Sequence, residues 1–240
     1  MKPFNTLEYI LYWAKKIIPR RLFEALQPIY HYLLSFLGAL VYRFPSRKLA
    51  IIAITGTKGK TSVAELVNAI FEEAGCTTAL SSTLRFKIGR RSENNMYKMT
   101  LPGRFFLQKF LRCAVSAGCT HAIVEITSEA AKQYRHTFLA LDALVFTNIA
   151  PEHIESHGSF EKYLAAKLAI ADALAHSSKK KTVVVANMDD SEGKKFLAVG
   201  ATEKHAYSLS DGCPYEITGY GITLTFRGKK IVSPLRGEFN

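Results

Sequence analysis

The stretch between Leu49 and Gly75 constrains the fold more than any other part of the chain, because it joins a buried strand to a helix through a glycine-rich turn. Residues Leu49–Thr55 read LAIIAIT, an uninterrupted apolar run typical of a strand covered on both faces. After the turn, apolar residues recur at helical spacing, at Ala64, Val67, Ile70, Phe71 and Ala74. Gly75 is a natural helix C-cap. This order predicts one strand–turn–helix unit of an α/β fold.

The same alternation continues along the chain. Three more buried strands are predicted, at Ala122–Ile126, Ala143–Thr147 and Thr182–Ala186. Two helical patterns lie between them, at Arg104–Ala117 and Phe160–Ala175. Strands that alternate with helices predict a mostly parallel, doubly wound sheet. After about Tyr207 the pattern changes to short β segments, at Ile222–Phe226 and Ile231–Leu235, with a turn at Gly228.

The first 48 residues differ from the rest and predict a helical extension. Apolar residues recur at helical spacing from Leu7 to Ile17, and Pro19 ends that pattern. Ala25–Tyr42 then runs for 18 residues without a charge. As a helix this run would be about 27 Å long, just under a hydrocarbon core of ~30 Å. Three interpretations stay open: a helical hairpin lying on a membrane surface, a helical cap packed on the domain, or a membrane-spanning helix.

The charge distribution separates the same two regions. The chain carries a net charge of +12, and its first 50 residues hold eight basic residues against two acidic ones. A nucleic-acid-binding surface would not concentrate its charge beside the most apolar stretch, so the pattern favours peripheral contact of residues 1–48 with an anionic membrane and no nucleic-acid partner. With 48% apolar and 22% charged residues, the remainder is globular in composition. We therefore divide the chain into an extension, 1–48, and a domain, 49–240.

Cysteine usage indicates the compartment. Four cysteines form no CxxC pair and are too few for a disulfide scaffold, namely Cys76, Cys113, Cys119 and Cys213. The apolar stretch comes too late for a signal peptide, and Arg43–Pro45 follows it where a small-residue cleavage site would stand. We expect reduced thiols and a cytoplasmic location. The basic extension, residues 1–48, would hold the chain at the inner face of the membrane.

The glycine-rich turn carries the clearest chemistry. Its candidate cofactor-binding residues are Gly56, Thr57, Lys58, Gly59, Lys60, Thr61 and Ser62. Glycines let a loop turn tightly, so that its N–H groups face phosphate oxygens at the positive end of the helix. Lys60 would reach the β- and γ-phosphates, and the Thr61 hydroxyl would bind Mg²⁺. The spacing is a shorter GxxGKT than the Walker pattern, whose first glycine would fall at Ile54. The alternative is an ordinary glycine-rich turn.

Several motifs, in order over about 190 residues, resemble those of the Mur ligases. TGTKGKTS resembles the family's phosphate loop, with Lys58 where Asn is usual. The other matching segments are Glu125–Ser128, Phe146–Ile149, Glu152–His153, His157–Gly158, Ala165–Lys167, Asn187–Asp190 and Gly237–Asn240. The resemblance implies a central ATP-binding domain with this α/β fold, and ATP and Mg²⁺ as cofactors.

The resemblance also assigns roles to residues. Family members phosphorylate a carboxylate with ATP, and the amine of an amino acid then attacks the acyl phosphate. Lys60 and Lys167 become the candidate catalytic residues. Thr61 and Glu125 become candidate ligands of a first Mg²⁺, since hard oxygen donors suit this ion. His153 and Lys167 match the ligands of a second ion, and Lys167 matches the family lysine that CO₂ carbamylates. A surface His and a solvated helix Lys are the alternatives.

The acceptor substrate is expected at a separate set of positions. Thr100, Ser128 and Arg135 match family residues that contact the muramoyl-peptide, and an Arg fork suits a carboxylate or phosphate. Glu129 departs from the family pattern, which often has His there, so the resemblance does not carry over the fine shape of this pocket. The resemblance implies a UDP-muramoyl-peptide and an amino acid as substrates.

Whole domains of the family have no counterpart in the sequence. Residues 1–48 do not match the UDP-binding N-terminal domain, and the pattern ends at Asn240 within the central domain. We therefore expect a fragment or a truncated product that binds ATP without forming an amide bond by itself. Two other functions stay open: a related ligase acting on a folate-like or lipid-linked acceptor, and a non-catalytic, membrane-attached nucleotide-binding remnant. The amino acid and the oligomeric state are not predicted.

Overall fold

The computed structural model describes residues 20–97, 99–152 and 154–234. Its centre is an eight-stranded sheet of order β4-β3-β2-β5-β1-β6-β7-β8. The strands are β1 (Ala50–Thr55), β2 (Thr78–Ser81), β3 (Arg85–Ile88), β4 (Arg91–Asn94), β5 (His121–Glu125), β6 (Ala143–Phe146), β7 (Val183–Asn187) and β8 (Glu203–Tyr207). The six strands from β2 to β8 in this order pair in parallel, and β3 and β4 add an antiparallel edge. The mostly parallel α/β sheet predicted from the sequence is confirmed.

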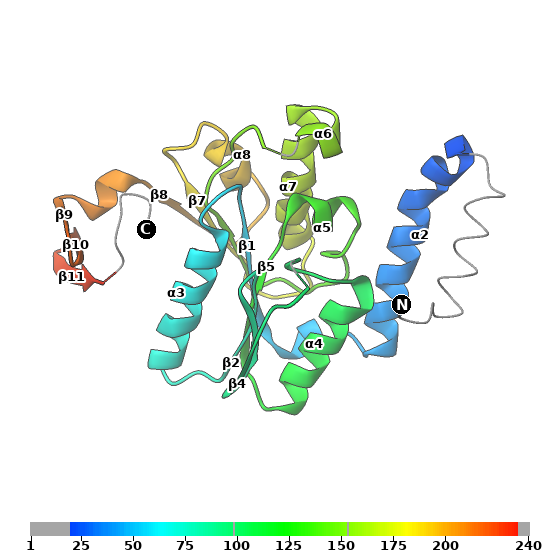
Figure 1. Ribbon diagram of the computed structural model, residues 1–240, viewed down its shortest axis with the longest axis horizontal. Helices are drawn as coiled ribbons and strands as arrows, with labels where there is room; N and C mark the ends of the chain where they lie inside the picture. The colour runs from blue at the N-terminus through cyan, green and yellow to red at the C-terminus, as the bar shows by residue number, and fades with distance from the viewer. Residues whose placement is uncertain (1–19, 98, 153, 235–240) are drawn as a thin grey trace.

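Helices cover both faces of the sheet (Figure 1). Ile52 and Ile54 of β1 pack in a cluster with Ala64 of α3 (Lys60–Glu73). Ile51 and Ala53 point to the opposite face. That face is covered by α4 (Arg104–Ser116), α5 (Ser128–Lys132), α7 (Phe160–Ala175) and α8 (Gly193–Leu197). Alternate residues of β1 thus pack into two hydrophobic clusters, one on each face of the sheet. The strand is apolar along nearly its whole length for this reason.

The predicted elements match the structure closely where the pattern is long. The helix predicted at Phe160–Ala175 has these bounds, and the buried strands agree within one residue at each end. Gly75 has φ +82° and ends the last turn of α3 as predicted, with the Cys76 amide donating to the Phe71 carbonyl. The short strands β2, β3, β4 and β8 were not predicted.

A second, three-stranded antiparallel sheet lies at one end of the molecule (Figure 1). It consists of β9 (Tyr215–Thr218), β10 (Gly221–Phe226) and β11 (Lys229–Ser233). The structure confirms the C-terminal β segments and the turn, where Gly228 has φ +75°. The 3₁₀ turn η2 (Leu209–Gly212) joins this sheet to β8.

At the other end, α2 (Arg20–Val41) forms an outer layer that packs on α4 (Figure 1). Arg112 of α4 donates to the Tyr42 carbonyl at 2.7 Å, and the 3₁₀ turn η1 (Pro45–Lys48) leads into β1. The uncharged run predicted to be helical is thus confirmed as a helix. None of the helices in the described part of the chain combines the length and apolarity needed to cross a membrane. The helix predicted at Leu7–Ile17 lies outside the described residues, and the boundary at residue 48 stays a prediction.

Candidate functional site

The glycine-rich loop, Gly56–Gly59, lies between β1 and α3 at the carboxyl edge of the sheet. β1 pairs with β5 on one side and β6 on the other, and the chain extends the sheet outward in both directions from there. A crevice at such a switch point is where open α/β sheets bind ligands. Local sequence therefore places the loop at the position where the fold has room for a ligand.

Gly56 is required by close packing. Its φ is +154°, and a Cβ built on it would lie 1.9 Å from Thr147 Oγ1. The next two amides are bound by Asn148: the Thr57 amide donates to its carbonyl at 2.8 Å and the Lys58 amide to its Oδ1 at 2.9 Å. The end of β6 thus shapes the first half of the loop.

The second half of the loop leads into the N-terminus of α3. Gly59 is left-handed, with φ +76°, and no side chain caps the helix there. Uncapped amides and the helix dipole suit an anion, which fits a bound phosphate. Lys60 Nζ donates to the Thr57 carbonyl at 2.8 Å, so its ammonium lies over the loop. Burial lowers the pKa of Lys60, and the charges of Glu125 and Glu152 partly oppose this change.

Glu125 ends β5 and is buried beside the loop. Its carboxylate accepts hydrogen bonds from Thr61 Oγ1 at 3.1 Å, Thr83 Oγ1 at 3.1 Å and the Thr83 amide at 2.9 Å. Among the described residues, no group of three His, Cys, Asp or Glu side chains could hold a metal by itself. One carboxylate with hydroxyl neighbours fits Mg²⁺, which keeps waters and phosphate oxygens as its other ligands.

Lys167 lies on α7 and is buried under the loop. Its Nζ donates to the Gly56 carbonyl at 2.5 Å and lies 4.8 Å from the centroid of the Tyr163 ring. Burial, and secondly the positive charge of Lys60, lower the pKa of Lys167 to about 7. The solvated helix lysine considered as its alternative is therefore wrong.

The remaining loop positions differ in their surroundings. Lys58 is exposed and its ammonium lies 3.2 Å from a Glu152 carboxylate oxygen. Thr57 is buried, and its Oγ1 lies 2.9 Å from Tyr163 Oη. Ser62 is exposed on α3. His153 lies outside the described residues, so its role stays a prediction.

Thr100, Ser128 and Arg135, from three separate segments, line one cavity of about 410 Å³. Ser128 Oγ lies 3.1 Å from His157 Nε2. Arg135 donates to Gln133 Oε1 at 2.7 Å and to the Leu101 carbonyl. Thr83 lines the same cavity and also binds Glu125, so the cavity adjoins the candidate metal site.

Three residues that shape the site were missed by the sequence analysis. Asn148 was quoted within a motif without a role, and Tyr163 and Thr83 were not singled out. Thr83 follows β2, and a strand prediction there would have placed it at the ligand-binding edge of the sheet. Tyr163 comes four residues before Lys167 and shares its helix face, a signal that was available.

Comparisons with known proteins agree with this geometry. The family model for the Mur ligase middle domain matches residues 54–240. A UDP-N-acetylmuramyl-tripeptide synthetase of Roseiflexus sp. (strain RS-1) is 36% identical over 186 residues, covering 73% of this chain and 36% of that protein. A UDP-N-acetylmuramoyl-L-alanyl-D-glutamate–2,6-diaminopimelate ligase of Chlamydia caviae is 30% identical over 213 residues, covering 85% of this chain. The chain thus spans only 36% and 43% of the length of these two relatives.

Solved structures show the same fold. A UDP-N-acetylmuramoyl-L-alanyl-D-glutamate–2,6-diaminopimelate ligase superposes with a TM-score of 0.71 at 23% identity, covering 86% of this chain and 45% of that one. A Mycobacterium tuberculosis folylpolyglutamate synthase complexed with ADP gives a TM-score of 0.61 at 17% identity, covering 80% of this chain and 50% of that one. The resemblance to the Mur ligases that the sequence predicts is confirmed. The chain belongs to the Mur ligase family, and residues 54–240 match the middle domain of that family.

Proposed function

We propose that this chain forms the ATP- and Mg²⁺-binding region of a ligase that adds an amino acid to a UDP-muramoyl-peptide in peptidoglycan synthesis. The observation that carries the proposal is the loop itself. An uncapped helix N-terminus and the ammonium of Lys60 lie beside the buried carboxylate of Glu125, which the neighbouring strand β5 supplies. This combination suits a polyphosphate with a divalent cation.

In this proposal, positively charged and N–H groups bind the phosphates, and oxygen donors bind the metal. The amides at the start of α3 and Lys60 hold the phosphates and stabilise negative charge as the γ-phosphoryl group transfers. Thr61 and Glu125 hold the metal, and bound Mg²⁺ supplies positive charge against the phosphoryl oxygens. A carboxylate oxygen of the acceptor attacks the γ-phosphorus and ADP leaves. The amine of the amino acid then displaces phosphate from the acyl carbon.

Lys167 is proposed as a second metal ligand after it reacts with CO₂ to form a carbamate and a proton. Of the described residues, no carboxylate pairs with its Nζ within 4.0 Å, so no ion pair holds the amine in its charged form. Carbamylation would replace the ammonium of Lys167 with an anion, so the repulsion between the charges of Lys167 and Lys60 would become an attraction. His153 is proposed as the neighbouring ligand from the family resemblance alone.

The cavity lined by Thr100, Ser128 and Arg135 is proposed to hold the peptide end of the acceptor. Its position next to Thr83 brings a bound carboxylate toward the phosphate loop. We place the reaction in the cytoplasm, where the four free cysteines remain reduced.

Calorimetry on the 1–240 chain tests the acceptor directly. UDP-N-acetylmuramoyl-L-alanyl-D-glutamate should bind, and Arg135→Gln should weaken this binding about 10-fold or more, because a charge-assisted hydrogen bond is lost. The matched control Arg90→Gln changes an exposed arginine outside the cavity and should have no effect. Preferential binding of tetrahydrofolate would favour a folate-type ligase and contradict the proposal.

A further inference from the structure

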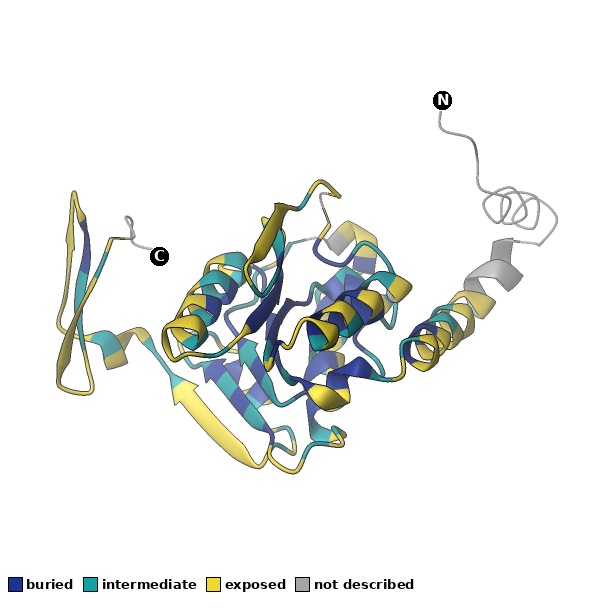
Figure 2. Ribbon diagram, turned by 90° about the horizontal axis from the view of Figure 1, so that it is seen from below, coloured by how far each residue is buried: buried dark blue, intermediate teal, exposed yellow. Residues whose placement is uncertain are grey.

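The most prominent surface feature outside the site is the side of α2 that points away from the domain. Large apolar side chains recur there at helical spacing, and each is at least 42% exposed. We call this surface the outer face of α2; its residues are Leu26, Ile29, Tyr30, Leu33, Leu37 and Leu40. From first to last they extend about 21 Å along the helix. Figure 2 shows α2 projecting from the body, with exposed residues along its length in yellow.

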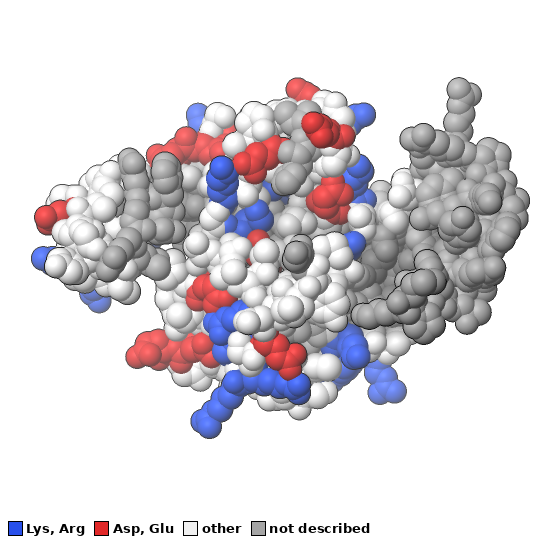
Figure 3. Space-filling view, viewed as in Figure 1, with Lys and Arg blue, Asp and Glu red and all other residues white. Residues whose placement is uncertain are grey.

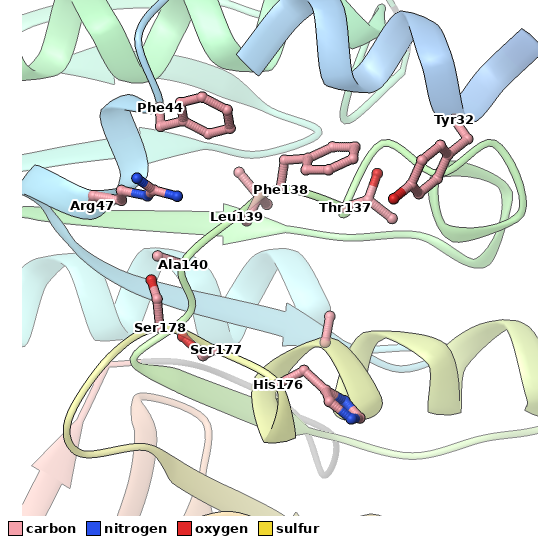
Figure 4. Close-up of a pocket in the computed structure, with 11 residues that line it drawn as sticks. Tyr32, Phe44, Arg47, Thr137, Phe138, Leu139, Ala140, His176, Ser177 and Ser178 are labelled. Atoms are coloured by element: carbon pink, nitrogen blue, oxygen red, sulfur yellow. The ribbon is translucent and has the colours of Figure 1, made fainter. Parts of the chain in front are cut away.

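The side of α2 that packs on the domain has the opposite character. Its buried residues are small or polar: Ser35, Gly38 and Ala39. At its flanks, Tyr32 and Phe36 contact the Phe138 ring, with centroids 5.1 and 5.3 Å apart (Figure 4 shows Tyr32 and Phe138). A helix that only capped the domain would turn its large apolar residues inward. Here they face outward, which leaves a second apolar face on the helix.

The charges around α2 indicate what kind of partner its outer face would bind. The helix carries no charge from Ala25 to Val41. Arg20 and Arg21 precede this run together with Glu24, and the charged residues that follow it closely in sequence are all basic. At the C-terminal end Arg43, Arg47 and Lys48 are exposed, and no described carboxylate lies within 4.0 Å of their charged groups. Figure 3 shows Lys and Arg side chains along the lower edge of the molecule, with Asp and Glu side chains among them.

A neighbouring loop adds to this basic region. Lys179 donates to the Leu49 carbonyl at 2.6 Å, which brings the run Lys179–Lys181 beside η1. Lys179 and Lys181 have acidic partners, Asp142 at 3.0 Å and Glu203 at 3.9 Å. Lys180 is exposed and adds one more positive charge. An apolar stripe with exposed basic groups at its described C-terminal end matches the interface of an anionic bilayer.

We propose that the outer face of α2 docks the chain reversibly on an anionic lipid bilayer, with the helix lying along the membrane surface. A second copy of the chain fits this surface less well. Both ends of the helix are basic, so a two-fold pairing in either direction would bring like charges together. The proposal does not depend on the reaction proposed above.

Vesicle sedimentation of the 1–240 chain tests the proposal. Vesicles of phosphatidylcholine with phosphatidylglycerol should bind the chain, pure phosphatidylcholine should not, and raising the salt should release it. Leu33→Gln with Leu37→Gln should reduce binding about 10-fold or more at unchanged net charge. The matched control is Leu66→Gln with Ile70→Gln, which changes two exposed apolar residues at the same spacing on α3 and should bind as the unchanged chain does.

The basic residues need their own comparison. Arg43→Gln with Lys48→Gln should reduce binding about 25-fold, at about 5-fold for each charge, while Lys229→Gln with Lys230→Gln on β11 should not. Equal binding to both vesicle types, or unchanged binding in the Leu33 and Leu37 variant, would overturn the proposal. Thermal unfolding and sedimentation velocity complete the test. Absence of vesicle binding, with unfolding or dimer dissociation in that variant, would assign the face to another segment of this chain or to a second copy.

Discussion

The hydroxyl of Tyr163 lies 2.9 Å from Thr57 Oγ1, which ties α7 to the phosphate loop through a buried contact. One helical turn later, Lys167 donates to the Gly56 carbonyl at 2.5 Å. Two consecutive loop residues are therefore held by one face of a helix more than 100 residues away in sequence. The shape of the loop depends on α7 as well as on its own glycines.

Tyr163→Phe should lower the free energy of unfolding by about 1 kcal/mol and weaken ATP binding several-fold, because Thr57 loses a buried partner. Chemical denaturation and calorimetry measure the two effects. Tyr207→Phe is the matched control, since the Tyr207 hydroxyl donates to the Phe146 carbonyl at 3.3 Å outside the loop. It should cost similar stability and leave ATP affinity unchanged. Equal effects of both variants on affinity would show that the Tyr163 contact has no special role.

Gly56→Ala should be the most damaging single change in the loop. The added Cβ would collide with Thr147 Oγ1, and φ of +154° is strained for any other residue. We expect a loss of about 2–4 kcal/mol in the free energy of unfolding, measured with urea. Gly59→Ala, with open space around the Cβ, should cost about 1 kcal/mol. A Gly56→Ala chain as stable as the Gly59→Ala chain would contradict the close packing described here.

His136 should make stability depend on pH. Burial lowers the pKa of His136 to about 4, so the folded chain favours the neutral ring more than the unfolded chain does. The neutral His136 ring therefore contributes fully to stability above about pH 6.5. As the pH falls from about 6.5 toward 4, the free energy of unfolding should decrease by up to about 3 kcal/mol. Denaturation of His136→Gln between pH 4 and 8 should show a smaller loss. His176→Gln, at an exposed histidine, should keep the full pH dependence.

Glu125→Gln should weaken ATP binding about 10-fold in Mg²⁺ and by less than about twofold without metal, because the charge lost is that of a metal ligand. Calorimetry with Mg²⁺ and with a chelator measures both. Glu65→Gln, which breaks the ion pair between Glu65 of α3 and Arg85 of β3, should change neither affinity. If the loss were the same in both conditions, Glu125 would be a structural carboxylate.

Much of the fold could be predicted from the sequence because the central strands are buried on both faces. An apolar run such as Leu49–Thr55 leaves few other structures open, whereas the outermost strand β4 and its neighbour β3 are short and contain charged and polar residues. β4 is exposed along its whole length, so no apolar alternation marks it. β2 is buried but has only four residues, too few to show a period.

The part of the site formed by consecutive residues of the chain could be predicted from the sequence. The loop from Gly56 to Thr61 is contiguous, and its glycines and lysine indicate phosphate binding directly. Thr83 and Asn148 contribute through tertiary contacts with Glu125 and Lys58, which no local pattern contains. The burial of Lys167 likewise follows from the packing of α7 under the loop and not from the helix sequence around it.

The most direct test of the central claim is the affinity of Lys60→Ala for Mg²⁺-ATP, measured by calorimetry on the 1–240 chain. The Lys60 ammonium lies over the loop and does not pack in the core, so the variant should fold normally. Lys109→Ala, at an exposed lysine of α4, is the control. A phosphate-binding loop predicts that Lys60→Ala loses about 10- to 100-fold in affinity while Lys109→Ala loses none. Unchanged affinity in a folded Lys60→Ala chain would contradict the account.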